Sequence, residues 1–383
     1  MDPADYNMVV KRDRVTDAVA PSGFPDTVEI PERFIRTDEV RASVVVGEEE
    51  AAYELPVVDM ASLLDPELSA SETAKLGSAC RDWGFFQLTN HGVDEAVMQQ
   101  MKDSAAQFFS LPLESKNAVA VRRGGLQGFG HHFNGPAAAS DDAGGGGDQH
   151  SAKLDWAECL LLDTQPVESR NMEFWPTDPP AFRDALDAYS AEMASLARRL
   201  LGFMAADLGV NQEALKAAFF GGGGGDEMRQ TMGVHHYPPC RRPDTVIGMT
   251  PHTDAFGLTL LLHLDDTPGL QVRRGDGRWF PVRPLPGAFV VNVGDALDVL
   301  SNAAYRSVEH RVLPHAHRAR TTVVVFQDAS AGGGVLAPLP ELLLAGDEPP
   351  RYRSIEKLQY SKGYLRALGQ GTNFLHTLKT SSR

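Results

Sequence analysis

The sequence predicts an α+β protein with a mainly β core, in which helices accompany a sandwich or an antiparallel jelly-roll barrel. Beyond about residue 230, short runs rich in β-branched and aromatic residues are separated by Gly, Pro, Asp and Asn, which is typical of a sandwich or jelly-roll barrel. The runs are TVIGM, LTLLLHL, GLQVRR, RWFPVRP, AFVVNV, RSVEHRVL and RTTVVVFQ. Before that point, strand-like and helix-like segments alternate.

The N-terminal part supplies the predicted flanking helices. Residues 53–60 and 85–93 are β-rich and predict two strands. One helix is predicted with Ser71 as its N-cap, and a second begins at Asp94. The longest helical pattern covers residues 179–210, which we expect to pack against the outside of a sheet.

Changes in composition divide the chain into four parts and mark two insertions. The parts are an N-terminal arm (1–50), a helical and β region (51–220), the jelly-roll region (228–330) and a helical tail (331–383). Gly-rich segments at 137–152 and 221–227 predict surface insertions. No Lys-Ser pair follows either segment, so neither resembles a phosphate-binding loop.

Charge and cysteine usage exclude several functional classes. A net charge of −15 argues against binding to nucleic acid or to an anionic membrane surface. The three cysteines, Cys80, Cys159 and Cys240, lie too far apart for a disulfide framework or a zinc knuckle. The first residues contain no apolar signal segment, and no run of 18 apolar residues predicts a membrane span. A cytoplasmic protein with a small-molecule partner is therefore expected, with a monomer as the default.

The segment PHTDAFGLTLLL places His252 and Asp254 two positions apart at the start of an apolar strand. Side chains at i and i+2 share one face of a strand, so both point the same way. His310, in YRSVEHRVL, adds an imidazole to another apolar strand face. Two histidines and one carboxylate on one side of a metal leave other positions open, which suits Fe(II) oxygenases. Taken alone, a His-x-Asp pair is more often a polar pair at the rim of a strand than a ligand set. A single histidine such as His310 in a strand is more often a hydrogen-bonded core or edge residue.

Arg320 and Thr322 strengthen the metal interpretation. They share one face of a predicted strand, and a buried guanidinium requires an anion. A dicarboxylate that chelates iron at one end would place its far carboxylate on Arg320 and on the Thr322 hydroxyl. Zinc-dependent hydrolysis would not require this arginine.

At this point the sequence resembles the plant 2-oxoglutarate- and Fe(II)-dependent dioxygenases, in particular the specialised-metabolism branch with codeine-demethylase-like and senescence-related oxygenases. The resemblance extends over most of residues 30–370, through LPVVDM, CRDWGFFQLTNHGV, FFSLPLESK, KLDWAE, PHTDAFGLTLLL and RARTTVVVF. It implies a distorted jelly roll (a double-stranded β-helix) with flanking helices. It also implies the use of Fe(II), 2-oxoglutarate and O₂, with ascorbate as a reductant.

Matching positions imply roles for individual residues. His252, Asp254 and His310 match the iron ligands, and Arg320 and Thr322 match the family's Arg-x-Ser anchor for 2-oxoglutarate, with Thr in place of Ser. In HHYPPC, Tyr237 keeps the tyrosine expected to contact 2-oxoglutarate. His235 replaces the usual asparagine, and Gly233 replaces a residue that is often basic.

The resemblance implies that a small, largely apolar plant metabolite is oxidised while 2-oxoglutarate is converted to succinate and CO₂. Hydroxylation is the expected reaction, with demethylation and desaturation within the family's range. Indoleamine (melatonin-like), flavonoid, alkaloid and hormone substrates would all fit. Phe326, Phe133 and His235 are the candidate substrate contacts, and core packing explains the two phenylalanines equally well.

Two other functions remain open on the sequence: a jelly-roll oxidase that does not use 2-oxoglutarate, and a non-catalytic barrel that binds a small molecule. Turnover coupled to succinate release distinguishes the first, and insensitivity to His252→Ala the second. The other histidines considered, His131, His132, His263, His315 and His317, are interpreted as surface or loop residues.

Overall fold

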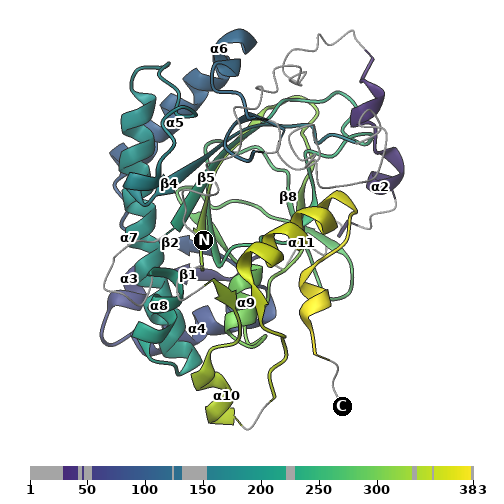
Figure 1. Cartoon of the computed structure of the whole chain (residues 1–383). Coiled ribbons are helices and arrows are strands. Elements are labelled where there is room, and N and C mark those ends of the chain that lie inside the picture. The colour runs from purple at the N-terminus through teal and green to yellow at the C-terminus, as the bar shows by residue number, and fades with distance from the viewer. Residues whose placement is uncertain are drawn as a thin grey trace.

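Two β-sheets face each other at the centre of the molecule, and helices cover the outer face of the larger sheet (Figure 1). The computed structural model describes residues 29–41, 45–46, 54–122, 125–131, 153–220, 229–329, 334–346 and 349–380. The two-sheet core with flanking helices confirms the predicted α+β jelly-roll fold class. Both Gly-rich insertions lie outside the described residues.

The larger sheet has eight strands in the order β1-β2-β10-β7-β12-β5-β4-β3. Their bounds are β1 (Val57–Asp59), β2 (Phe85–Thr89), β10 (Phe289–Val293), β7 (Leu258–His263), β12 (Arg320–Asp328), β5 (Arg229–Tyr237), β4 (Glu158–Gln165) and β3 (Gly128–Gly130). The smaller sheet has the order β6 (Met249–His252), β11 (His310–Val312), β8 (Leu270–Arg273) and β9 (Trp279–Pro281). A third sheet pairs β13 (Val335–Leu336) with β14 (Ile355–Glu356). The larger sheet thus combines strands from both sides of residue 220, which explains why the two halves of the sequence form one core.

Alternation along β7 divides the side chains of the larger sheet between two layers. Leu258, Leu260 and Leu262 belong to the cluster that includes the helices. Leu261 belongs to a second cluster, between the two sheets. We call the space lined by this second cluster the barrel interior; its members include Phe85, Tyr237, Met249, Leu270, Val312, Val324 and Phe326. Thr259 and His263 lie two positions from Leu261, so they also face the barrel interior.

The two helices predicted most clearly are confirmed. α7 (Phe182–Leu208) ends at Gly209, whose φ of 67° is left-handed and free of strain for glycine. α5 (Glu95–Ser110) follows Asp94, whose carboxylate accepts a hydrogen bond from the Ala96 amide at 2.8 Å. The other α-helices are α2 (Thr37–Arg41), α3 (Met60–Leu64), α4 (Ser69–Asp82), α6 (Leu113–Asn117), α8 (Gln212–Phe220), α9 (Asp295–Leu300), α10 (Pro340–Gly346) and α11 (Lys357–Gly369).

The predicted N-cap at Ser71 is wrong. α4 begins at Ser69, and Ser71 lies inside its first turn. Its hydroxyl donates to the Leu68 carbonyl at 2.8 Å instead of accepting from a helix amide. Leu68 occupies the N-cap position without a side-chain hydrogen bond, so helix packing outweighs capping here.

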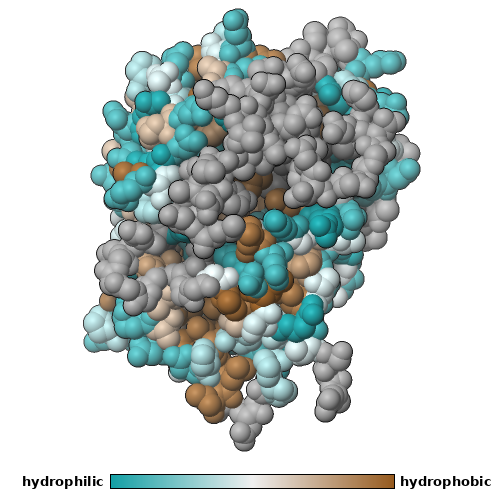
Figure 2. Space-filling model, in the orientation of Figure 1, coloured by the Kyte–Doolittle hydropathy of each residue, from teal (hydrophilic) through white to brown (hydrophobic). Residues whose placement is uncertain are grey.

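Large apolar side chains lie mostly in the two layers, and those exposed at the surface are scattered. Leu344, on α10, is 84% exposed, and Figure 2 shows apolar residues at the lower edge of the molecule where α10 projects. Of the helices in the described residues, none is both long and apolar enough to cross a membrane.

A buried ion pair joins the N-terminal helices to the sheet. Lys116 of α6 donates to Glu158 of β4, with 2.6 Å between Nζ and Oε2, and the side chains are 2% and 1% exposed. The Lys116 ammonium also lies 5.3 Å from the ring centroid of Phe129. Breaking such a pair by removing one partner leaves a desolvated charge, whereas replacing both partners removes that cost.

Lys116→Met is therefore expected to lower the free energy of unfolding by about 3–5 kcal/mol. The double variant Lys116→Met/Glu158→Leu should recover most of that loss because no charge remains buried. Urea unfolding of the two variants and the parent measures both differences. A single variant as stable as the parent would contradict the role assigned to the pair.

Candidate metal centre and adjoining anion pocket

His252, Asp254 and His310 come together although they lie on different elements. His252 is the last residue of β6, and His310 is the first residue of β11, directly opposite it in the strand register. Asp254 lies in the loop after β6, so the prediction that both His252 and Asp254 lie within a strand is wrong. The two side chains still converge because hydrogen bonds turn the Asp254 carboxylate.

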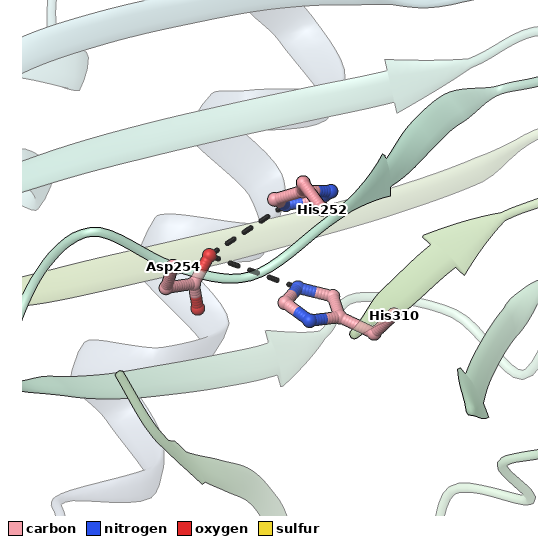
Figure 3. A group of neighbouring side chains, drawn as sticks. All are labelled: His252, Asp254 and His310. Carbon is pink, nitrogen blue, oxygen red and sulfur yellow. Dashed lines mark ion pairs between the residues drawn. The ribbon is translucent and has the colours of Figure 1, made fainter. Parts of the chain in front are cut away.

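The three side chains could hold one metal ion (Figure 3). His252 Nε2 lies 3.6 Å from Asp254 Oδ1, and His310 Nε2 lies 3.7 Å from the same oxygen. One ligand atom from each residue lies within 4.8 Å of the other two. Metal–ligand bonds of about 2.0–2.2 Å fit a single ion between atoms at such separations.

Backbone carbonyls orient both imidazoles of the candidate metal centre. His252 Nδ1 lies 2.7 Å from the Thr250 carbonyl oxygen, and His310 Nδ1 lies 3.2 Å from the Val308 carbonyl oxygen. A carbonyl only accepts, so each Nδ1 carries a hydrogen, and in the neutral ring each Nε2 presents its lone pair. Burial, together with nearby His252, lowers the pKa of His310 to about 4, which keeps this ligand neutral.

Asp254 is held as a carboxylate with one oxygen directed to the histidines. Its Oδ2 accepts from the Thr259 hydroxyl at 2.6 Å and from the Asn292 amide nitrogen at 2.7 Å. Burial alone would raise the pKa of Asp254, but His310, His252 and the Thr259 hydrogen bond hold it well below its usual range. Oδ1 therefore remains a charged ligand atom at neutral pH.

The C-terminal helix α11 fixes the backbone between the first two metal-binding candidates. The Tyr364 hydroxyl donates to the Thr253 carbonyl at 2.7 Å, and Asn373 Nδ2 donates to the Thr253 hydroxyl at 3.3 Å. The Thr253 hydroxyl donates to Asp295 at 3.1 Å, and the Tyr360 hydroxyl of α11 donates to the same carboxylate oxygen at 2.5 Å. In Figure 1, α11 lies across the barrel beside α9, which begins at Asp295.

Arg320 and Thr322 form a candidate anion pocket on the inward face of β12. Both are 1% exposed, and in the described residues neither the guanidinium nitrogens nor the Thr322 hydroxyl has a hydrogen-bond partner. Tyr237 pairs with Arg320 in register, and the guanidinium carbon lies 5.2 Å from its ring centroid. Burial lowers the pKa of Arg320, and Tyr237 and Asp265 offset part of this effect. A desolvated cation without a hydrogen-bond partner fits an anionic ligand.

His263 was predicted to be a surface or loop residue, and that prediction is wrong. It is the last residue of β7, and its register partner on β12 is Thr322. Both ring nitrogens are buried, and within the described residues neither has a hydrogen-bond partner. The alternation of side chains along β7 would have predicted the inward position of His263, since Thr259, Leu261 and His263 share one face of the strand.

His235 lies beside this pocket and not among the metal-binding candidates. It is the register partner of Thr322 on β5, and its Nε2 lies 3.8 Å from Cys159 Sγ. A Cβ at position 233 would come within 2.6 Å of His235 Nε2, so the imidazole occupies space that Gly233 leaves open. The two departures from the family pattern are thus physically coupled.

Phe326 lines the barrel interior and stacks on Phe256, with 4.8 Å between ring centroids. Phe256 was not predicted, although it follows Asp254 by two positions in the same loop. Phe133 lies outside the described residues.

Tyr364→Phe is expected to weaken metal affinity about 10-fold, because the Thr253 carbonyl loses the donor that fixes the metal-binding loop. Tyr189→Phe is the matched control, since within the described residues the buried Tyr189 hydroxyl has no hydrogen-bond partner. Competition with a chelating dye measures both affinities. Equal metal affinity in the two variants would contradict the positioning role of α11.

Family models match most of the described chain. Residues 55–178 match the non-haem dioxygenase in morphine synthesis N-terminal family, and residues 228–329 match the 2OG-Fe(II) oxygenase superfamily. The chain is 39% identical to 2-oxoglutarate-dependent dioxygenase 11 of Oryza sativa subsp. japonica over 350 residues, covering 91% of each chain. It is 36% identical to codeine O-demethylase of Papaver somniferum over 303 residues, covering 79% of each.

Solved structures agree with these matches. The crystal structure of JOX2 in complex with 2OG, Fe and JA superimposes with a TM-score of 0.78 at 28% identity, covering 95% of this chain and 98% of that one. The dioxygenase for auxin oxidation from rice gives a TM-score of 0.66 at 27% identity, covering 85% of this chain and 100% of that one. The chain belongs to the 2OG-Fe(II) oxygenase superfamily and is an oxygenase that uses 2-oxoglutarate and Fe(II).

Proposed function

We propose that this oxygenase holds Fe(II) through His252, Asp254 and His310 and binds 2-oxoglutarate through Arg320 and Thr322, with Tyr237 alongside. The proposal rests on two features of the same barrel, each of which requires a ligand. Three potential ligand atoms converge on one point, and the nitrogens of a buried guanidinium have no hydrogen-bond partner in the described residues. A keto acid that chelates a metal at one end and carries a carboxylate at the other meets both requirements.

Strand register supports placing both ends of 2-oxoglutarate in this space. Thr259, which hydrogen-bonds Asp254, and His263, opposite Thr322, lie four residues apart on the same face of β7. That spacing corresponds to about 13 Å along the strand. Leu261 lies between these two positions and would form the apolar floor under the co-substrate.

When bound, Fe(II) and 2-oxoglutarate supply the oxidising chemistry with O₂, and the co-substrate leaves as succinate and CO₂. The chain contributes position and charge. Nδ1 hydrogen bonds aim the two imidazoles, Thr259 and Asn292 aim the carboxylate of Asp254, and Arg320 fixes the far end of the co-substrate. No protein general base is required, and the apolar walls of the barrel interior exclude bulk water.

The proposed substrate is a small, largely apolar plant metabolite, such as an indoleamine (melatonin-like), flavonoid, alkaloid or hormone. Phe326 and Phe256 offer stacked aromatic surface in the barrel interior, and His235 offers a polar contact. A relative from Ocimum basilicum, 35% identical over 350 residues and covering 91% of this chain and 87% of its own, is named a flavonoid 7-O-demethylase. Hydroxylation is the proposed reaction, with O-demethylation and desaturation as its variants. The proposal includes a cytoplasmic monomer with no nucleic-acid or membrane partner, for which the net charge of −15 is the support.

Succinate-coupled turnover tests this function directly. The protein is supplied with Fe(II), 2-oxoglutarate, ascorbate and O₂, and plant metabolite fractions are screened for substrate-dependent succinate with an oxidised product. Asp254→Ala should lose metal binding and succinate formation together. Product formation without consumption of 2-oxoglutarate would support the alternative oxidase, and ligand binding unchanged by His252→Ala would support a non-catalytic barrel.

Arg320→Met is expected to raise the stability of the ligand-free protein and to weaken the binding of 2-oxoglutarate. Removing a desolvated charge should raise the melting temperature of the ligand-free protein by about 2–5 °C. The same change should weaken 2-oxoglutarate binding about 30-fold or more, because the far carboxylate loses its bidentate partner. Thermal unfolding and anaerobic calorimetry measure the two effects.

Arg318→Met is the matched control for Arg320→Met. Arg318 lies two residues earlier, and its ion pair with Asp266 is exposed to solvent. It should change neither the melting temperature nor the binding constant appreciably. An Arg320→Met protein that binds 2-oxoglutarate as tightly as the parent would refute the assigned anchor.

A further inference from the structure

Three neighbouring side chains on two paired strands hold buried polar atoms with no partner in the part of the chain that the structure describes. They are all three guanidinium nitrogens of Arg320, the hydroxyl of Thr322 and both ring nitrogens of His263. Thr322 and His263 face each other across β12 and β7, where directly opposed Cβ atoms lie about 4.5–5.5 Å apart. Native proteins rarely leave one such group unsatisfied, so a cluster of three indicates a ligand.

The hydrogen-bonding capacity of a carboxylate matches this cluster. An ionised carboxylate presents roughly four lone-pair sites and no donors. A bidentate arginine fills two of these sites and the threonine hydroxyl fills a third. One site remains, and His263, the register partner of Thr322 on β7, has an N–H that no described residue engages.

The charge state of His263 suits a donor at this position. Burial, and then the neighbouring Arg320 cation, hold the pKa of His263 well below its usual value. The neutral ring keeps one N–H to donate and adds no second positive charge beside Arg320. His263 would therefore contribute a directed hydrogen bond to the carboxylate, whereas Arg320 contributes the positive charge.

We propose that His263 is a third donor to the far carboxylate of the co-substrate and makes the pocket selective for a keto acid that carries this second carboxylate. The inference rests on the proposed function, because it assumes that Arg320 and Thr322 bind 2-oxoglutarate. If His263 served only in core packing, it would make no hydrogen bond to the co-substrate.

The test compares two keto acids that differ at the far end only. Binding of 2-oxoglutarate and of 2-oxopentanoate, which lacks the far carboxylate, is measured anaerobically by calorimetry on the full-length Fe(II)-loaded protein. His263→Leu and His263→Phe both delete the donor but differ in shape. His263→Gln restores an N–H on a neutral side chain. His317→Leu, at an exposed histidine, is the control.

Loss of one hydrogen bond to a charged group should weaken 2-oxoglutarate binding about 10- to 100-fold in the Leu and Phe variants. Their affinity for 2-oxopentanoate should stay within about 2-fold of the parent, because that ligand never makes the contact. The Gln variant should recover most of the affinity for 2-oxoglutarate. Thermal unfolding of each variant verifies that the protein is folded.

Equal weakening for both keto acids, or unchanged binding of 2-oxoglutarate in both the Leu and Phe variants, would overturn the role of His263. That result leaves the proposed function intact as long as the parent protein binds 2-oxoglutarate in a metal-dependent way. A parent protein that binds neither keto acid would instead contradict the proposed function, and the inference would fail with it.

Discussion

The register in which β12 pairs with β5 and β7 determines which side chains meet inside the barrel. Arg320 lies opposite Tyr237, Thr322 lies between His235 and His263, and Phe326 lies opposite Thr259. A shift of one residue would turn Val323 and Val325 inward and move Arg320 into the helix-covered layer. The apolar contacts of those valines with the outer layer therefore fix the position of the polar groups on the other face. Core packing and the active site are specified by the same alternation.

Buried charges in this fold are treated in two different ways. Lys116 and Glu158 neutralise each other inside the protein, so that pair is complete without a ligand. Asp254 and Arg320 are also desolvated, but their counter-charges come from outside the chain if the proposed roles hold. Carrying such groups lowers the stability of the ligand-free protein, and binding of metal and co-substrate returns part of that free energy. Stability and ligand occupancy are linked for this reason.

Local patterns were sufficient to predict part of the site. Period-two alternation placed Arg320 and Thr322 on one face, and the His-x-Asp pair with His310 identified the three residues that converge. The same alternation includes His263, yet the sequence interpretation assigned this histidine to the surface or to a loop. Asp254 could not be placed by a strand rule, because its orientation comes from Thr259 and from Asn292, 38 residues away. Contacts of that range are set by tertiary packing, as is the link between Tyr364 and Thr253 across 111 residues.

The contact between Tyr364 and Thr253 joins two parts of the chain that are synthesised at different times. A ribosome makes His252, Asp254 and His310 before it makes Tyr364 and Asn373, so the candidate ligands emerge while the loop between the first two is still without its C-terminal contacts. Metal captured by the growing chain would meet a looser loop than the one in the finished protein. The hydrogen bonds of Tyr364 and Asn373 to Thr253 can therefore all form only after translation has passed residue 373. Truncation before Tyr364 would remove both contacts from the loop that joins His252 to Asp254.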